Sequence, residues 1–261
     1  RPANTCSDLL PLNMRRGKTV QSEDTMVNRV WVIGKHSYIA QRTMRVLTES
    51  RLPFFCLSRT PAAGDHYFDL ARAGDFDFSL IEENDIVLMF AGMSSPDECC
   101  RNKALAQKIN VVGTAIFAQE ALERKGRVVF FSSDTVYGPA DTVRYEDSPV
   151  NPSNFYAQLK CDVERRFRDE KSFKALRLSY VFGRGDKYMR YLYSCSAGRA
   201  VARVYHPFVR NVVSLHDVVS SVLALMTRWE SFEPSILNVC GPELLSRVDL
   251  TGLYKANVDP A

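Results

Sequence analysis

Short apolar runs alternate with amphipathic stretches along most of the chain. Strands are expected at residues 30–33, 53–57, 67–70, 85–90, 127–131 and 175–178, and helices at residues 37–49, 96–125 and 151–170. Strands rich in Val, Ile and Phe that alternate with helices are typical of a parallel sheet covered on both faces. The pattern therefore predicts an α/β fold built on a doubly wound parallel sheet.

Small and polar residues stand where three of these strands end. Gly34 follows the first strand, Ala91-Gly92 follows the fourth, and Ser132-Ser133 follows the fifth. In an open parallel sheet, ligands bind at the carboxyl ends of the strands, near the point where the strand order reverses. We therefore expect these residues to meet in one crevice.

The same pattern divides the chain into parts. Residues 1–25 are polar and show neither the helical nor the strand periodicity of apolar residues, so a disordered or non-native leader is expected. Residues 26–183 form the sheet domain, 216–235 pack back onto it, and 184–215 with 236–261 form a smaller lobe. The chain opens on Arg1 rather than Met and stops at Ala261, which favours a fragment.

Composition narrows the class of protein. A chain of 261 residues with 46% hydrophobic content can bury a large core, and its net charge of +4 comes without a dense Lys/Arg stripe, so nucleic acid is not an expected partner. The seven cysteines are odd in number and lack metal-type spacing, which predicts free thiols in a reducing cytoplasm and no metal site. No apolar run approaches the roughly 20 residues that span a bilayer.

The first turn is a weakened dinucleotide-binding turn. Gly34, Ser37 and Ala40 stand where small residues let the backbone approach a pyrophosphate, and Ser37 could donate to a phosphate at the helix N-terminus. Tyr38 and Ile39 are expected beside the cofactor. An ordinary strand-to-helix turn is an equal alternative on this stretch alone.

The end of the second strand bears on the choice of cofactor. Ser58-Arg59 replaces the acid that usually binds the ribose hydroxyls of NAD, and a cation there accommodates a 2′-phosphate. NADP is therefore favoured, with NAD as the alternative; Arg59 as a solvated loop residue is the other interpretation. Asp69 and Leu70 are expected near the adenine, and Ala91-Gly92 along the cofactor.

Tyr156 and Lys160 lie four residues apart on an expected helix and share one face. A neighbouring ammonium favours the phenolate, so we expect Lys160 to lower the pKa of Tyr156. A phenol tuned in this way can exchange a proton with a sugar or alcohol oxygen. Ser133, at the end of a neighbouring strand, could hold the reacting carbonyl.

The order of these motifs resembles that of the extended short-chain dehydrogenase/reductases. The residues that carry the resemblance are the Gly34 turn, Ala91-Gly92, the run 110–114 (Asn-Val-Val-Gly-Thr), the run 132–138 (Ser-Ser-Asp-Thr-Val-Tyr-Gly) and Tyr156-x-x-x-Lys160. Within that group, residues 28–241 look most like the NAD-dependent epimerase/dehydratase family, which acts on nucleotide sugars. The resemblance implies a Rossmann-type dinucleotide-binding domain with a substrate-binding lobe.

The resemblance also implies roles for single residues. Ser133, Tyr156 and Lys160 match the catalytic triad, with Tyr156 as acid/base and Lys160 on the nicotinamide ribose, and Asn110 matches a helix asparagine that orders the site. Arg210 matches an arginine that grips the substrate diphosphate, with a surface arginine as the alternative. The other residues expected around the substrate are Ser94, Asp134, Thr135 and Tyr180.

The expected activity is NAD(P)-dependent reduction or epimerisation of a nucleotide-activated sugar. The 4,6-dehydratases of the family carry Thr-Asp-Glu where this chain has Ser133-Asp134-Thr135, so a dehydratase ranks lower. A reductase of a non-nucleotide ketone and a non-catalytic dinucleotide-binding protein are the alternatives. The family often pairs subunits through helices that correspond to residues 96–125 and 151–170, so a homodimer is expected.

Overall fold

The protein is described by a computed structural model over residues 27, 29–139, 142–206 and 208–258, so the expected leader lies outside the described residues. Its strands are β1 (Val30–Ile33), β2 (Phe54–Ser58), β3 (His66–Tyr67), β4 (Ile86–Met89), β5 (Arg127–Ser133), β6 (Phe173–Leu178), β7 (Tyr180–Phe182), β8 (Val209–Ser214), β9 (Ile236–Val239) and β10 (Glu243–Ser246). Its α-helices are α1 (Tyr38–Glu49), α2 (Pro96–Arg101), α3 (Lys103–Gln107), α4 (Thr114–Glu123), α5 (Phe155–Phe167), α6 (Lys187–Ala197), α7 (Leu215–Thr227) and α8 (Arg247–Asn257). Shorter helical turns are η2 (Leu70–Asp75), η3 (Phe78–Leu80), the π-helical η4 (Lys108–Gly113), η5 (Asp134–Tyr137) and η6 (Trp229–Ser231).

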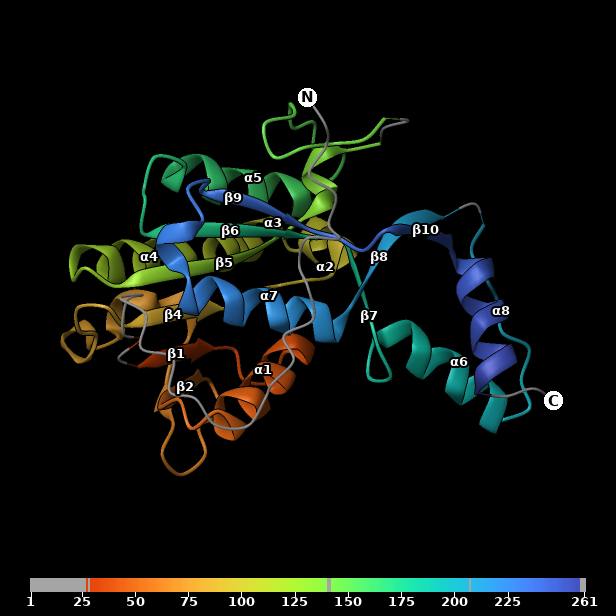
Figure 1. Ribbon diagram of the computed structural model, residues 1–261, viewed down its shortest axis with the longest axis horizontal. Coiled ribbons are helices and arrows are strands. Elements are labelled where there is room, and N and C mark those ends of the chain that lie inside the picture. Colours follow the sequence, from red (N-terminus) through yellow and green to blue (C-terminus); the bar gives the residue numbers. More distant parts are fainter. Residues whose placement is uncertain (1–26, 28, 140–141, 207, 259–261) are drawn as a thin grey trace.

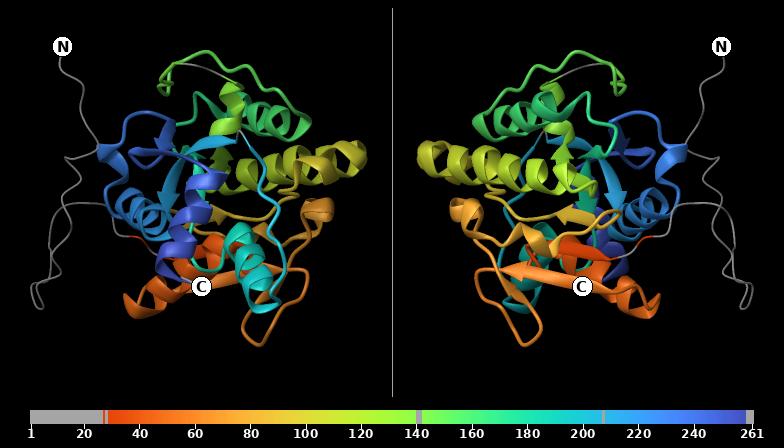
Figure 2. Two further views of the ribbon diagram at one scale, coloured as in Figure 1. Left: turned by 90° about the vertical axis from the view of Figure 1, so that its right-hand side faces the viewer. Right: turned by 90° about the vertical axis from the view of Figure 1, so that its left-hand side faces the viewer.

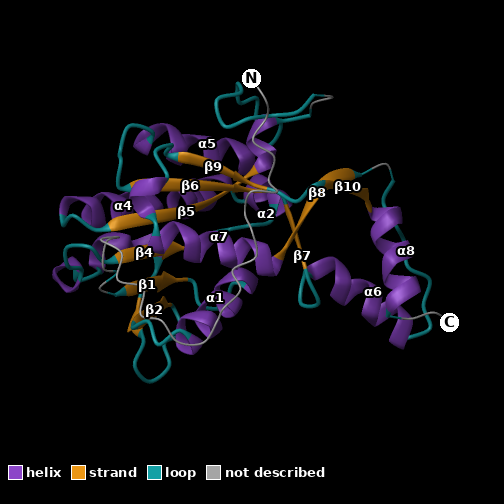
Figure 3. Ribbon diagram, viewed as in Figure 1, coloured by secondary structure: helices purple, strands orange, loops and turns teal. Residues whose placement is uncertain are grey.

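Seven parallel strands form the central sheet, in the order β3-β2-β1-β4-β5-β6-β9 (Figures 1 and 3). The order reverses between β1 and β4, because β1 pairs with β2 on one side and with β4 on the other. The doubly wound α/β fold expected from the sequence is confirmed. The carboxyl ends of β1 and β4 flank the switch point, where such folds bind their ligands.

Alternate residues of the buried strands feed two hydrophobic cores. In β1, Trp31 and Ile33 face one core while Val30 and Val32 face the other. The first core is closed by α4 and α5, and the second by α1 and α7, so helices cover both faces of the sheet (Figure 2). The return of residues 216–235 to the sheet domain agrees with the position of α7.

A second, three-stranded sheet lies beside the first, in the order β10-β8-β7, and carries α6 and α8 (Figure 1). Met189, Leu192 and Leu250 form its small core. The lobe boundaries expected at residues 183 and 236 are corrected by one strand each. β7 pairs with β8 in the small sheet, whereas β9 extends the large sheet beside β6, where its apolar residues find a partner strand.

Two expected elements are also corrected. The long helix over residues 96–125 is broken at Asn102 (φ −121°, ψ 53°) and passes through the π-helical turn η4 before α4 begins. The third strand, expected over residues 67–70, stops at Tyr67, because the Asp69 carboxylate accepts a hydrogen bond from the backbone N–H of Ala71 (2.9 Å) and starts the turn η2. None of the helices in the described part of the chain has the length and hydrophobicity needed to span a bilayer.

Candidate active site

Lys160 fixes α5 against the end of β5. Its ammonium donates a hydrogen bond to the carbonyl of Phe131 (2.7 Å) and lies 4.5 Å from the ring centre of Phe130. It also lies 5.6 Å from the ring centre of Tyr156, one helical turn earlier. The shared helix face expected from the four-residue spacing is therefore present.

The same contact sets the level of Tyr156 relative to Ser133. Since α5 connects the parallel strands β5 and β6, it runs antiparallel to them. Moving from Lys160 to Tyr156 along the helix covers about 6 Å. Moving from Phe131 to Ser133 along the strand covers about 6.6 Å in the same direction. The step from Lys160 to Tyr156 and the step from Phe131 to Ser133 thus both lead toward the carboxyl edge of the sheet.

Burial dominates the electrostatics of this pair. It raises the pKa of Tyr156 to about 12, and it lowers the pKa of Lys160 to about 8 against the opposing charge of Glu164. The expected lowering of the Tyr156 pKa is therefore wrong for the protein without cofactor. The Lys160 ammonium is directed at the Phe131 carbonyl rather than at the phenol oxygen. The cost of burying a phenolate therefore outweighs any stabilisation of its charge by Lys160.

Ser133 ends β5 and caps the turn η5. Its hydroxyl oxygen accepts hydrogen bonds from the Thr135 hydroxyl (3.0 Å) and the Thr135 backbone N–H (3.3 Å). The side chain of Asp134, between them, forms an ion pair with Arg210 of β8. Three of the residues expected around the substrate (Asp134, Thr135 and Arg210) are thus brought together with Ser133, where the two sheets face each other.

Asn110 orders the segment that follows β4. Its side-chain carbonyl accepts from the Met93 backbone N–H (2.8 Å), and its amide donates to the Met93 carbonyl (2.9 Å). Asn110 lies in the π-helical turn η4, and such turns occur often at functional sites. Ser94, which follows Met93 in the chain, is exposed. Asn110 therefore acts on the site through the backbone of residue 93.

A second arginine, Arg247, faces the same region and was missed by the sequence analysis. Its guanidinium carbon lies 4.3 Å from the ring centre of Tyr180 and 4.1 Å from that of Tyr188, so two aromatic rings hold it. Its Nη1 is buried without a hydrogen-bond partner. Burial and the charge of Arg247 lower the pKa of Arg210, which shows that the two cations are close. The sequence around Arg247 shows only a helix start capped by Ser246, and nothing in it indicates the contact with Tyr180 and Tyr188.

Glu164 was also missed. It is 4% exposed and binds the Arg177 guanidinium (2.7 Å) and the Ser132 hydroxyl beneath the carboxyl edge of the sheet. The spacing Lys160-x-x-x-Glu164, which places the two residues on one helix face, could have shown it. This carboxylate faces Lys160 from inside the protein and favours its charged form.

The turn between β1 and α1 fits a dinucleotide pyrophosphate. Gly34 has φ +90°, and a Cβ there would lie 2.8 Å from the Ala91 backbone, so only glycine brings these two strand ends together. Ser37 caps α1 without a side-chain hydrogen bond, and the first turn has no acidic residue. The N–H groups of the helix start therefore meet no side-chain competitor for an anion.

The side chains of Tyr38 and Ile39 are used elsewhere. Ile39 packs into the core beneath α1. The Tyr38 hydroxyl is buried without a hydrogen-bond partner, against Gly183 and Gly185 of the loop after β7. Cofactor contacts at these two positions are therefore left to the backbone.

The expected adenosine-binding residues lie around the ends of β2 and β3. Ser58 is buried and accepts a hydrogen bond from the Thr60 backbone N–H (2.9 Å), whereas Arg59 is exposed. Asp69 uses its carboxylate as the cap of η2, and Leu70 is buried in the core. Gly92 (φ +154°) lies against Asn110.

Tyr180 does not line the crevice as expected. Its hydroxyl donates to the Asp186 carboxylate (2.6 Å), which caps α6, and its ring packs in the core of the small lobe. Tyr180 therefore supports the lobe and the guanidinium of Arg247 rather than offering its hydroxyl to a substrate.

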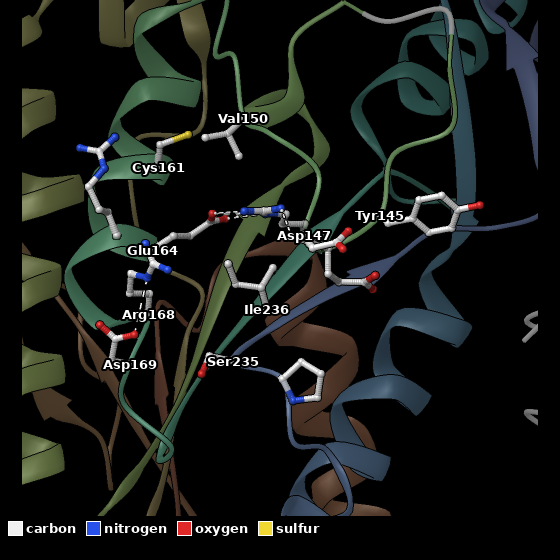
Figure 4. Close-up of a pocket in the computed structure, with 13 residues that line it drawn as sticks. Tyr145, Asp147, Val150, Cys161, Glu164, Arg168, Asp169, Ser235 and Ile236 are labelled. Carbon is white, nitrogen blue, oxygen red and sulfur yellow. Dashed lines mark hydrogen bonds and ion pairs between the residues drawn. The ribbon is translucent and has the colours of Figure 1, made fainter. Parts of the chain in front are cut away.

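A cavity of about 790 Å³ lies between α5, β6, the start of β9 and the segment around residues 145–150 (Figure 4). Glu164 and Arg177 are among its lining residues, together with Cys161 and Ile236. Ser133, Tyr156 and Lys160 do not line it, so it is separate from the place where we expect the chemistry. Within the described residues, no group of three or more His, Cys, Asp or Glu side chains could hold a metal ion.

Comparison with known proteins identifies the family. Residues 28–251 match the family described as the RmlD substrate binding domain. The chain belongs to this family. The match covers most of the chain and confirms the resemblance to the extended short-chain dehydrogenase/reductases.

Two curated relatives of this RmlD-family chain share parts of it. The spore coat polysaccharide biosynthesis protein SpsK of Bacillus subtilis is 26% identical over 62% of this chain and 57% of its own length. The UDP-glucose 4-epimerase of Neisseria gonorrhoeae is 35% identical over 33% of this chain and 27% of its own length. The chain thus spans between about a quarter and three fifths of these relatives.

Solved structures share the fold. MoeE5 in complex with UDP-glucose and NAD, and a hypothetical dTDP-4-dehydrorhamnose reductase from Sulfolobus tokodaii, both align with a TM-score of 0.77, over 88% of this chain and 82% of theirs, at 21% and 22% identity. RMD from Pseudomonas aeruginosa, complexed with NADPH, aligns with a TM-score of 0.71 over 88% of this chain and 83% of its own, at 23% identity. At these identities the likeness establishes the arrangement of the two sheets.

Proposed function

We propose that this chain carries out NAD(P)-dependent reduction or epimerisation at a sugar carbon of a nucleotide-activated sugar. The observation that carries the proposal is the contact of Lys160 with the Phe131 carbonyl, which ties the helix of Tyr156 to the strand that ends at Ser133. Family membership and relatives named for polysaccharide biosynthesis and UDP-glucose epimerisation support the substrate class. The fold neighbours include complexes with NAD and with NADPH.

Tyr156 is the proton donor and acceptor. Because burial holds its pKa at about 12, the phenol keeps its proton at neutral pH and can deliver it to a carbonyl oxygen. Ser133 hydrogen-bonds the same oxygen and stabilises the negative charge that develops there. A bound nicotinamide cofactor supplies the hydride that the carbonyl carbon receives. In an epimerase the oxidation comes first, so Tyr156 would have to enter the cycle as the phenolate, take the proton of the sugar hydroxyl and later return it.

Lys160 and Asn110 position these groups. Lys160 holds α5 against β5 through the Phe131 carbonyl, and its ammonium would bind the nicotinamide ribose. Asn110 fixes the backbone at Met93, next to Ala91-Gly92 on the cofactor side. Reduction or epimerisation is favoured over 4,6-dehydration, since Thr135 stands where the dehydratases carry a glutamate.

The substrate diphosphate is expected between the sheets. Arg210 and Arg247 bring two guanidinium groups to this place against the single carboxylate of Asp134. Charge-assisted forks onto phosphate oxygens are the chemistry for which arginine is suited. A nucleoside diphosphate would displace the Asp134 side chain from Arg210 and cancel the excess positive charge.

NADP is favoured over NAD because Arg59 directly follows β2. The test is a fluorescence titration of the protein with NADPH and with NADH, each with and without UDP or dTDP. Saturable cofactor binding that a nucleoside diphosphate strengthens is the expected result. Absence of binding by either cofactor would overturn the proposal and leave a non-catalytic protein on this fold.

We also propose a homodimer through the helices of residues 96–125 and 151–170. Leu105, Val112 and Ile116 on that surface are 47%, 47% and 37% exposed, which leaves apolar area to be covered. Light scattering coupled to gel filtration should give twice the chain mass. Ile116→Glu should shift that mass toward the monomer, and a monomeric wild-type protein would contradict the proposal.

A further inference from the structure

An ion pair links the turn after β1 to the residue before β3 in the large sheet. Lys35 directly follows Gly34 after β1, and Asp65 directly precedes β3. Their side chains pair although they are 30 residues apart, and they are only 13% and 14% exposed. The pair therefore lies in a sheltered position that starts at the end of β1 and reaches the amino end of β3, where Asp65 stands beside Cys56 of β2, close to the turn assigned above to the cofactor.

The Asp65 carboxylate is held in place from more than one side. It accepts a hydrogen bond from the Ala62 backbone N–H (2.7 Å) in addition to the Lys35 ammonium. The thiol of Cys56 lies against it, and burial together with the Asp65 charge raises the pKa of that thiol to about 11, so it stays neutral. Lys35 is thus the cation that neutralises Asp65.

This placement changes the interpretation of the end of β2. A dinucleotide site for NAD carries a carboxylate there for the ribose hydroxyls, whereas a site for NADP carries a cation for the 2′-phosphate. Here Arg59 directly follows the strand and is exposed, while the Asp65 carboxylate comes from the end of the loop that leads to β3. The region therefore holds both a cation, Arg59, and a carboxylate, Asp65, and Lys35 is already paired with that carboxylate.

We propose that Asp65 is the residue that determines the cofactor preference, by offering a carboxylate to the ribose hydroxyls and by withholding Lys35 from a 2′-phosphate. The inference rests on the function proposed above. NADH is then accepted in spite of Arg59, because Asp65 replaces the missing acid. NADPH is bound by Arg59 alone, against the repulsion between its phosphate and the Asp65 carboxylate.

The test measures cofactor binding by calorimetry, in the absence of substrate, for the wild-type protein, Asp65→Asn, Lys35→Met and the double variant. Asp65→Asn should raise the preference for NADPH over NADH at least tenfold. On its own, Lys35→Met should shift the preference toward NADH, because it leaves the Asp65 carboxylate unneutralised beside the 2′-phosphate. In the Asp65→Asn background it should cancel most of the gain in NADPH binding, because Lys35 is available to the phosphate only there. Non-additivity of this kind is the signature of two coupled residues.

Asp75→Asn is the matched control, since Asp75 is an exposed acid that pairs with Arg72 on η2; it should leave the preference unchanged. An unchanged preference in Asp65→Asn, with both cofactors still binding, would overturn the inference but not the proposed function. If Asp65→Asn fails to fold, Lys35→Met alone remains a test, because an unchanged preference between NADPH and NADH in that variant, with both cofactors still binding, would overturn the inference equally. Failure of the wild-type protein to bind either cofactor would overturn both.

Discussion

The carboxylate of Asp134 and the guanidinium of Arg210 form an ion pair that joins the two sheets of the protein. Asp134 directly follows the last residue of β5, and Arg210 belongs to β8. The two partners are 29% and 24% exposed, so an anion that enters between the sheets can reach them. The contact between the sheets is thus one that a diphosphate, in the proposed function, would exchange for its own.

This exchange predicts opposite effects for the two partners. Arg210→Gln should weaken UDP binding at least tenfold, because a hydrogen bond to a charged group contributes about 1.5–3 kcal/mol and about 1.4 kcal/mol corresponds to tenfold. Asp134→Asn should strengthen UDP binding several-fold, because the competing carboxylate is removed. Calorimetric titration with UDP measures both. Arg165→Gln, at an exposed arginine of α5, is the control; equal affinities in all four proteins would remove the diphosphate site from this cleft.

Tyr156→Phe tests the acid/base role. Loss of a general acid should lower turnover by about 10²- to 10⁴-fold, while NADPH binding stays within about threefold because the ring and its packing are retained. Steady-state turnover of a nucleotide-activated keto-sugar and a cofactor titration measure the two quantities. Tyr193→Phe, on the exposed side of α6, should leave both unchanged. Normal turnover in Tyr156→Phe would contradict the proposed mechanism.

Lys160 predicts a dependence of stability on pH. Its pKa is about 8 in the folded protein and 10.5 when exposed, so folding favours the neutral amine. The unfolded chain binds the extra proton between these two values, and the free energy of unfolding therefore rises across that window, by up to about 1.4 kcal/mol per pH unit. Below pH 8 the contribution is constant and unfavourable.

Urea denaturation at several values from pH 7 to pH 10.5 measures this effect. Since other groups titrate in the same range, the quantity to compare is the difference between the wild-type protein and Lys160→Met. That difference should shift in favour of the wild-type protein as the pH rises. A difference that does not depend on pH would mean that Lys160 keeps its ordinary pKa in the folded state.

The sequence was sufficient for the sheet domain, because its strands are continuous apolar runs and its helices start at recognisable caps. Asn154, which accepts from the Ala157 N–H (2.9 Å), begins α5 at the position needed to carry Tyr156 and Lys160. These signals are local. The turn at Gly34 was found for the same reason, since a left-handed residue between a strand and a helix favours glycine.

The features that could not be predicted from the sequence depend on contacts between distant residues. The pKa of Tyr156 could not be predicted from the spacing to Lys160, because it depends on how much water reaches the phenol. Tyr180 stands at a motif position of the family, yet its hydroxyl is taken by Asp186, and the guanidinium of Arg247 lies against its ring. The pairing of β9 with β6 likewise joins residues about 60 positions apart, which no local period reveals.

The close approach of η4 to Leu70 yields a prediction about stability. A Cβ on Gly113 would lie 1.9 Å from the carbonyl oxygen of Leu70, which is backbone and can move only with its turn. Gly113→Ala should therefore lower the free energy of unfolding by about 1–3 kcal/mol or more, as overpacking does. Because η4 also carries Asn110, cofactor binding should weaken with it.

Gly252 supplies the matched control, since a Cβ there meets nothing within 4 Å and the residue lies inside α8. Gly252→Ala should raise the free energy of unfolding by about 0.5–1 kcal/mol, because alanine favours the helix. Chemical denaturation compares the two variants with the wild-type protein under one condition. If Gly113→Ala were as stable as the wild-type protein, the backbone of η4 would not press against Leu70, and the position of Asn110 would have to be explained by its bonds to Met93 alone.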